Sequence, residues 1–195
     1  LLATAVQSAM GTRALPLLLV LLLLVRQSYV LLAQVSESYL RTLEVLVRAS
    51  EGAAQAGRTN SEVASELARK IAIRLGLSAA GVQRAVYTTL LCALSGISHE
   101  ATPSQIASRI VSQVGLFSGV VETLQLIEGR LVNDEVPDVD LTIAWVAIRS
   151  WDHVCAERGV DPVIPAASRE AVRGAMTSEA RVRVSRAMVG LGIEI

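Results

Sequence analysis

The chain has 195 residues, enough for one domain and a tether, and its formal net charge is zero. A neutral chain offers no strongly positive surface, which argues against nucleic acid as a partner. Hydrophobic residues make up 52% of the chain and the mean hydropathy is +0.48, which is high for a soluble protein and indicates a membrane-contacting part. The two cysteines, Cys92 and Cys155, form no disulfide pattern, which suits a reducing compartment.

Residues 1–26 are predicted to be a hydrophobic membrane-anchor segment. Ala14 to Val25 is a run of twelve apolar residues without a charge, with Arg13 before it and Arg26 after it. A helix that crosses a bilayer needs about 20 residues, so the run reaches that length only with its neighbours included. A signal peptide fits the length, but no small-x-small cleavage site follows. We expect Arg26 to mark the cytoplasmic boundary; the alternative is a helix buried in a protein core.

Residues 27–50 are predicted to form a signalling helix with coiled-coil character. Apolar residues recur at spacings of 3, 4, 4 and 3, as in a heptad seam: Leu32, Val35, Tyr39, Leu43 and Leu46. The helix over 32–46 can therefore pair two copies of the chain in a homodimer or bind another protein. Two heptads are too few to separate this from an amphipathic helix that packs on its own domain, so both alternatives stay open.

A recognisable sequence frame runs from Ala49 to Ile97. It reads A-S-E-G-A-A-Q-A-G-R-T-N-S at 49–61, V-A-S-E-L-A-R-K-I-A-I-R-L-G-L at 63–77 and Y-T-T-L-L-C-A-L-S-G-I at 87–97. In these segments the chain resembles the HD-GYP family, a branch of the HD superfamily that hydrolyses cyclic di-GMP. The family pattern is E-x-R-D, then G-H-S, then a helix ending I-A-x-x-L-G-L, then L-L-H-D-I-G-K. The resemblance implies an all-α, HD-domain-like helical bundle over residues 51–195.

The metal ligands of that family are missing from the frame. The G-H-S triplet falls on residues 59–61, with Asn60 at the histidine position, and the H-D pair falls on Cys92 and Ala93. HD-type catalysis needs metal ions, held by His and Asp, that activate a bound water. An amide binds transition metals poorly, a cysteine is a softer ligand and an alanine offers no ligand atom.

A fourth position, Asp152 in S-W-D-H-V, lies near the family's late A-D-x-x-D segment, and no H-H-E-x-x-D-G-x-G-Y-P segment is present. The resemblance therefore implies a degenerate domain with four vestigial site positions: Asn60, Cys92, Ala93 and Asp152. We expect no catalytic residue, no metal ligand and no cofactor.

The rest of the chain is predicted to be helical, because no segment has the two-residue period of a strand. We expect a helix over Ser61–Leu75, capped by Asn60 or Ser61 and stopped by Gly76, and a central buried helix over Val82–Leu94. An acidic loop is expected at Asn133–Asp140. Further helices are expected after Thr102-Pro103, along Val120–Leu131, over Leu141–Glu157 and near 167–175 and 178–189.

Other side chains suggest weaker candidates. The spacings of the histidines and cysteines match no common zinc module; these residues are Cys92, His99, His153 and Cys155. Cys92 lies in an apolar helix, where burial raises a thiol pKa, so an inert side chain is favoured over a nucleophile. A basic strip near the C-terminus can bind an anion or an acidic partner, or is a solvated helix face: Arg181, Arg183 and Arg186.

The leading expectation is a catalytically inactive HD-GYP-like signalling or interaction domain tethered to a membrane. HD-GYP proteins often have an N-terminal membrane part, so the resemblance implies the bacterial inner membrane, with the helical domain in the cytoplasm. Two alternatives stay open. One is a receptor for cyclic di-GMP or another nucleotide, and the other is a residual metal-dependent phosphodiesterase that uses His99, Asp152 and His153.

Overall fold

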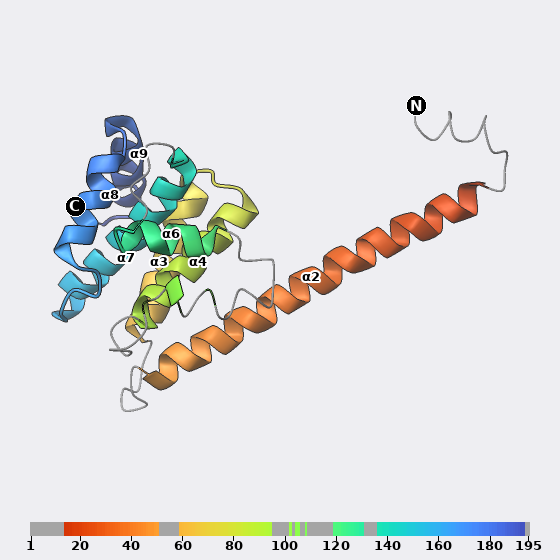
Figure 1. Cartoon of the computed structure of the whole chain (residues 1–195), viewed down its shortest axis with the longest axis horizontal. Coiled ribbons are helices and arrows are strands. Elements are labelled where there is room, and N and C mark those ends of the chain that lie inside the picture. Colours follow the sequence, from red (N-terminus) through yellow and green to blue (C-terminus); the bar gives the residue numbers. More distant parts are fainter. Residues whose placement is uncertain are drawn as a thin grey trace. The chain divides into compact units, whose positions relative to one another are not determined.

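The computed structural model describes residues 14–50, 59–94, 102, 104–105, 108, 119–130 and 136–193. All its regular elements in these ranges are helices, which confirms the predicted all-α class (Figure 1). They are α2 (Ala14–Ser50), α3 (Asn60–Arg74), α4 (Ala79–Leu94), α6 (Val120–Ile127), α7 (Asp138–Arg158), α8 (Ala166–Ala175) and α9 (Ser178–Val189). The chain divides into two compact units, Leu1–Thr42 and Leu43–Ile195.

The first unit contains most of α2, in which the apolar run and the expected signalling helix form one continuous helix of 37 residues. Large apolar side chains between Leu17 and Leu31 are exposed around the helix. A helix that is apolar all round is normally covered by lipid or by protein. Within the described residues, no helix combines the length and the apolar character that a membrane crossing requires.

The predicted heptad seam is described only in part. Val35, in the first unit, is exposed, whereas Val47, one residue beyond the seam and in the second unit, is fully buried. The side chains of Leu32, Tyr39, Leu43 and Leu46 lie outside the described residues, as do residues 1–13 and 51–58. Pairing of two copies through residues 32–46 therefore stays a prediction.

The N-terminus of α3 corrects one sequence prediction. Thr59 is the N-cap, not Asn60 or Ser61: its hydroxyl accepts a hydrogen bond from the Glu62 backbone N–H at 3.3 Å, and the Glu62 carboxylate accepts one from the Thr59 N–H at 3.3 Å. This reciprocal capping box requires Glu62 at the third helical position, and that register selects Thr59. The predicted stop is confirmed, because Gly76 follows the helix with φ +73°.

We expect Thr59→Ala to lower the free energy of unfolding by about 1 kcal/mol. The variant lacks the hydroxyl that accepts the hydrogen bond of the Glu62 N–H, and the reciprocal capping box at the start of α3 is broken. Urea unfolding followed by far-UV circular dichroism measures the change. Thr59→Ser is the matched control, since it keeps the hydroxyl and should stay close to the parent. Equal losses in both variants would contradict a capping role.

Helix α4 is the buried central helix that the sequence predicts, but it begins three residues earlier, at Ala79. Ser78 explains the early start, because its hydroxyl accepts a hydrogen bond from the Gly81 N–H at 3.2 Å. Tyr87, Leu90 and Leu91 are buried in the middle of the helix. The Trp151 indole of α7 donates a hydrogen bond to the Thr89 carbonyl at 2.9 Å, which ties α7 to α4.

Helix α7 also begins earlier than predicted, at Asp138, so the last part of the expected acidic loop is helical. Carboxylates in the first turn of a helix interact favourably with its N-terminal dipole, which is why Asp138 and Asp140 suit a helix start as well as a loop. Pro137 precedes the helix as its N-cap residue. The helix ends at Gly159, which has a left-handed backbone with φ +62°.

An arginine joins three helices at one point, which we call the Arg84 node. The Arg84 Nη2 of α4 donates to the Gly119 carbonyl at 2.9 Å, to the Thr123 hydroxyl at 3.2 Å and to the Asp140 carboxylate at 2.5 Å. The first two acceptors lie at the start of α6 and the third in the first turn of α7. Because the node is largely shielded from water, its polar groups depend on one another.

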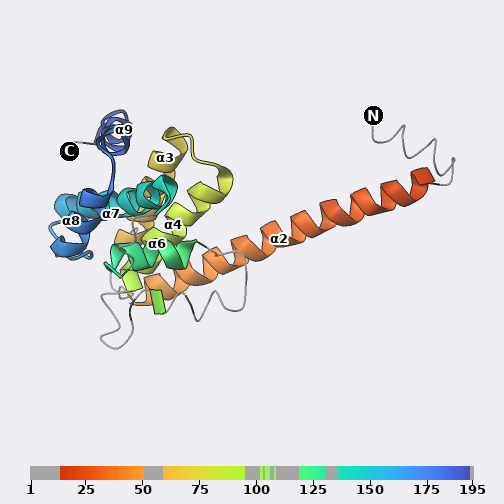
Figure 2. The ribbon, with the colours of Figure 1, turned by 45° about the horizontal axis from the view of Figure 1, so that its top comes forward.

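The main core lies where α3, α4, α7 and α9 meet, and Figure 2 shows these helices around a common centre. Its largest members are Ile71 from α3, Ile143 from α7 and Met188 from α9. Helices α6 and α8 pack on α7 and on each other. Since aromatic residues are scarce, aliphatic and alanine side chains fill this core.

Candidate functional site

Three of the four vestigial positions lie at one end of the helix pair α3 and α4 in the second unit. Helices α3 and α4 are joined by the short turn 75–78 and pack against each other, so the start of α3 and the end of α4 lie at the same end of the pair. Asn60 is the first residue of α3, and Cys92 and Ala93 lie in the last turn of α4. Arg158, at the end of α7, donates a hydrogen bond from Nη1 to the Asn60 Oδ1 at 2.7 Å. The ends of three helices therefore meet here.

Asn60 stands where the resemblance puts a metal-binding histidine. Its amide oxygen, the only atom that could serve as a ligand, accepts the Arg158 guanidinium hydrogen bond. A guanidinium at this place repels a metal cation and occupies the lone pairs that a cation would use. The side chain works as a link between α3 and α7.

Cys92 is a buried thiol beside a cavity of about 360 Å³. Burial, and secondarily the Glu128 carboxylate, raise the pKa of Cys92 from an ordinary 9.0 to about 12. A neutral thiol is a poor nucleophile and a poor metal ligand, which agrees with the inert role predicted for it. Ala93 is also buried. Neither Ala93, Asn60 nor Asp152 is among the residues that line this cavity.

We expect Cys92 to resist thiol reagents in the folded chain. Its thiolate fraction at neutral pH is about a thousandfold below that of a free cysteine, because three pKa units separate them. A Cys155→Ala variant leaves Cys92 as the single thiol, and labelling is compared before and after unfolding in guanidinium chloride.

The pH dependence of that variant's stability has a definite sign. The folded chain holds the Cys92 proton more tightly than the unfolded chain, so stability should fall as the pH rises above about 9. Replacing Cys92 by alanine should flatten this alkaline decline. Fast labelling of folded Cys92 near neutral pH would contradict the burial argument.

Glu128 is a residue of this region that the sequence reasoning missed. Its two carboxylate oxygens accept hydrogen bonds from the Ser104 backbone N–H and the Ser104 hydroxyl, each at 2.7 Å, and Arg130 lies 3.5 Å away. Together with Thr102, Arg130 and Ser168 it forms the polar part of the cavity wall. The sequence clue to Glu128 is a carboxylate directly after the apolar helix α6. Its partner Ser104 is 24 residues distant in the chain, so the sequence does not show the contact.

Asp152 lies on α7 between two arginines. Arg169 of α8 donates to its Oδ1 at 3.1 Å and Arg149 approaches its Oδ2 at 3.6 Å. Burial raises the pKa of Asp152 above its ordinary value, and the two guanidinium groups oppose that rise. Both carboxylate oxygens are thus engaged by cations, and Asp152 joins α7 to α8.

The remaining predicted ligand sets do not converge in the described residues. His153 pairs with Glu157 at 3.7 Å, the Cys155 thiol donates to the Asp161 carbonyl at 3.4 Å, and His99 lies outside the described residues. Over the described ranges, no three side chains of His, Cys, Asp or Glu come together as a metal site. Of the acidic cluster, Asp134 and Glu135 also lie outside these ranges.

No protein-family model, curated protein or solved structure matches this chain. The resemblance to HD-GYP proteins therefore stays a prediction from the sequence motifs.

Proposed function

We infer that the chain is a non-catalytic helical signalling domain, descended from an HD-GYP-type fold, that works by contacting other proteins. One observation carries this proposal: the side chains at the expected ligand positions are committed to the structure. Asn60 binds Arg158, Asp152 is held by two arginines, and Cys92 is a buried neutral thiol. Restoring a metal site would require breaking contacts that join α3, α7 and α8.

The proposal includes a membrane tether at the N-terminus, at the bacterial inner membrane with the helical domain in the cytoplasm. The tether is supported by the run of exposed leucines between Leu17 and Leu31, because exposing so much apolar surface to water is unfavourable. The signalling helix over 32–46 would then carry a signal to the second unit, alone or as a pair. Cell fractionation of the full chain, with Leu21 and Leu24 both replaced by lysine as the comparison, tests the tether.

The decisive test of the non-catalytic proposal is turnover. The full chain in a non-ionic detergent is incubated with cyclic di-GMP and Mn²⁺, and linear products are measured. We expect none above the background of a chain unfolded by heat. Manganese-dependent product that disappears when Asp152 and His153 are replaced by alanine would instead favour the residual phosphodiesterase.

A nucleotide receptor is the second candidate, because a cavity of about 360 Å³ lies beside Cys92, one of the four vestigial positions. Its wall offers Arg130 as a cation, but Glu128 already pairs with it and repels a phosphate. Calorimetric titration of cyclic di-GMP distinguishes the two candidates. Saturable heat without turnover would support the receptor, and Arg130→Ala should then weaken the binding.

A further inference from the structure

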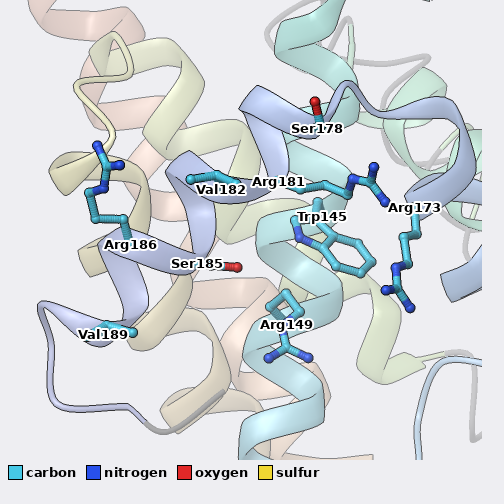
Figure 3. Close-up of a pocket in the computed structure, with 9 residues that line it drawn as sticks. All are labelled: Trp145, Arg149, Arg173, Ser178, Arg181, Val182, Ser185, Arg186 and Val189. Carbon is cyan, nitrogen blue, oxygen red and sulfur yellow. The ribbon is translucent and has the colours of Figure 1, made fainter.

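A groove of about 590 Å³ lies beside α7, away from the cavity at Cys92, and shares no lining residue with it. It is formed by α7, the end of α8 and one face of α9 (Figure 3). Among the described residues that line it, four are arginines and none is acidic: Arg149, Arg173, Arg181 and Arg186. The chain as a whole is neutral, so this groove concentrates positive charge locally.

Within the described part of the chain, two of the four arginines have no carboxylate partner. Arg149 pairs with Asp152 at 3.6 Å and Arg173 with Glu170 at 3.7 Å. No carboxylate of the described residues pairs with Arg181 or Arg186. In Figure 3 the Arg181 side chain extends from α9 toward Arg173, on the same side of the groove as Trp145. The Arg186 side chain points away from Trp145 in the same view, so Arg181 is the uncompensated cation at this edge, which therefore attracts negative charge.

Apart from Ser178 and Ser185, the other residues that line the groove are apolar. The half-buried ring of Trp145 lies in it, with the Arg149 guanidinium 6.0 Å from the ring centroid. Val182 and Val189 of α9 are 54% and 60% exposed, and their spacing of seven residues puts them on one face of the helix. An apolar stripe beside an uncompensated arginine, Arg181, matches the two faces of an amphipathic helix that carries acidic residues next to its apolar side.

We propose that this groove binds an acidic amphipathic helix of a partner protein, an inference that rests on the proposed function and names the chemistry of the partner. Charge complementarity selects an acidic partner, and the apolar stripe selects a partner with its own apolar face. A small inorganic anion would contact the guanidinium groups only and would leave Val182 and Val189 exposed to water. A flat anionic bilayer would meet the arginines on the rim but would not reach a ring set between two helices.

Trp145 provides a direct reading of binding. The other tryptophan, Trp151, is 2% exposed and its indole is bonded to Thr89, so a ligand in the groove should alter the fluorescence of Trp145 alone. The probe is a synthetic peptide of about 18 residues of leucine, alanine and glutamate, long enough to form a helix. We expect a saturable fluorescence change that Trp145→Phe removes, while calorimetry of that variant still detects binding.

Charge reversal on α9 supplies a matched pair of variants. Arg181→Glu should weaken peptide binding by tenfold or more, because it places a carboxylate against the acidic ligand. Arg183→Glu changes the net charge equally, but Arg183 lines a different cavity, with Leu77 and Asp138, so it should change binding by less than about threefold. Circular dichroism checks that both variants are folded.

The outcomes separate the alternatives. Equal weakening by the two reversals, or no saturable binding of the peptide, would overturn the inference. So would vesicles of phosphatidylglycerol that change Trp145 fluorescence in an Arg181-dependent way when the peptide does not. If the peptide does not bind and cyclic di-GMP is not turned over, the groove inference fails and the proposed function stands. If cyclic di-GMP is turned over and the peptide still binds, the proposed function fails and the groove inference stands.

Discussion

Replacing Ile71 by alanine is expected to lower the free energy of unfolding by about 3 kcal/mol, the largest effect of any single truncation that we predict. Ile71 is fully buried where α3 meets α4, α7 and α9. Its loss removes apolar contacts and leaves a cavity, because helices held on several sides cannot collapse to fill it. Chemical denaturation followed by circular dichroism gives the free energy directly.

Ile73, two residues along the same helix, is the matched control. It is 60% exposed, so Ile73→Ala removes the same atoms from a surface that is already largely in water. Alanine also has the higher helix propensity, so the stability should stay within about 0.5 kcal/mol of the parent or rise slightly. A comparable loss in both variants would mean that the core is not where we describe it.

The second large effect is expected at the Arg84 node. Arg84→Met keeps much of the side-chain volume but leaves Asp140, Thr123 and the Gly119 carbonyl without their common donor, a loss of about 3 kcal/mol. Arg84→Lys should restore only part of this, because an ammonium lacks the planar donor arrangement of a guanidinium. The measurement is again the denaturation midpoint, with its slope checked for two-state unfolding.

An exposed arginine provides the comparison for the node. Arg69 pairs with Glu66 at 3.7 Å on the surface of α3, where water screens the charges. Arg69→Met should therefore cost less than about 0.5 kcal/mol. If Arg69→Met and Arg84→Met were equally destabilising, the node would contribute nothing beyond an ordinary surface ion pair.

Helical periodicity predicted the described helices of the second unit but misplaced some of their ends, as at α6, which stops at Ile127 rather than Leu131. At α3, three consecutive residues can all cap a helix, and only the distance to Glu62 selects Thr59. At α7, the acidic residues 138 and 140 are as typical of a loop as of a helix start. In the structure both are helical, and Asp140 binds Arg84 of α4. Helix interiors follow local patterns, whereas these boundaries depend on individual side-chain bonds.

The candidate site was predictable in its composition but not in its contacts. The motif frame singled out Asn60, the late A-D-x-x-D segment singled out Asp152, and the apolar setting predicted the burial of Cys92. The arginine that binds Asn60 is 98 residues away, a separation that no local pattern spans. The sequence alone could have assigned Arg181 and Arg183 of the basic strip to different faces of their helix, because positions two apart on a helix point about 200° from each other. Arg183 accordingly lines another cavity than Arg181.

The Arg84 node also makes the residue types at positions 84, 119 and 140 depend on one another during evolution. Gly119 has φ +91°, and a Cβ atom built on it would lie 2.5 Å from the Arg84 guanidinium carbon, so a side chain there conflicts with both the backbone and the arginine. Asp140 in turn has its guanidinium partner only while Arg84 is present. Among related chains, positions 84, 119 and 140 should covary, with the glycine and the aspartate retained together or lost together with the arginine.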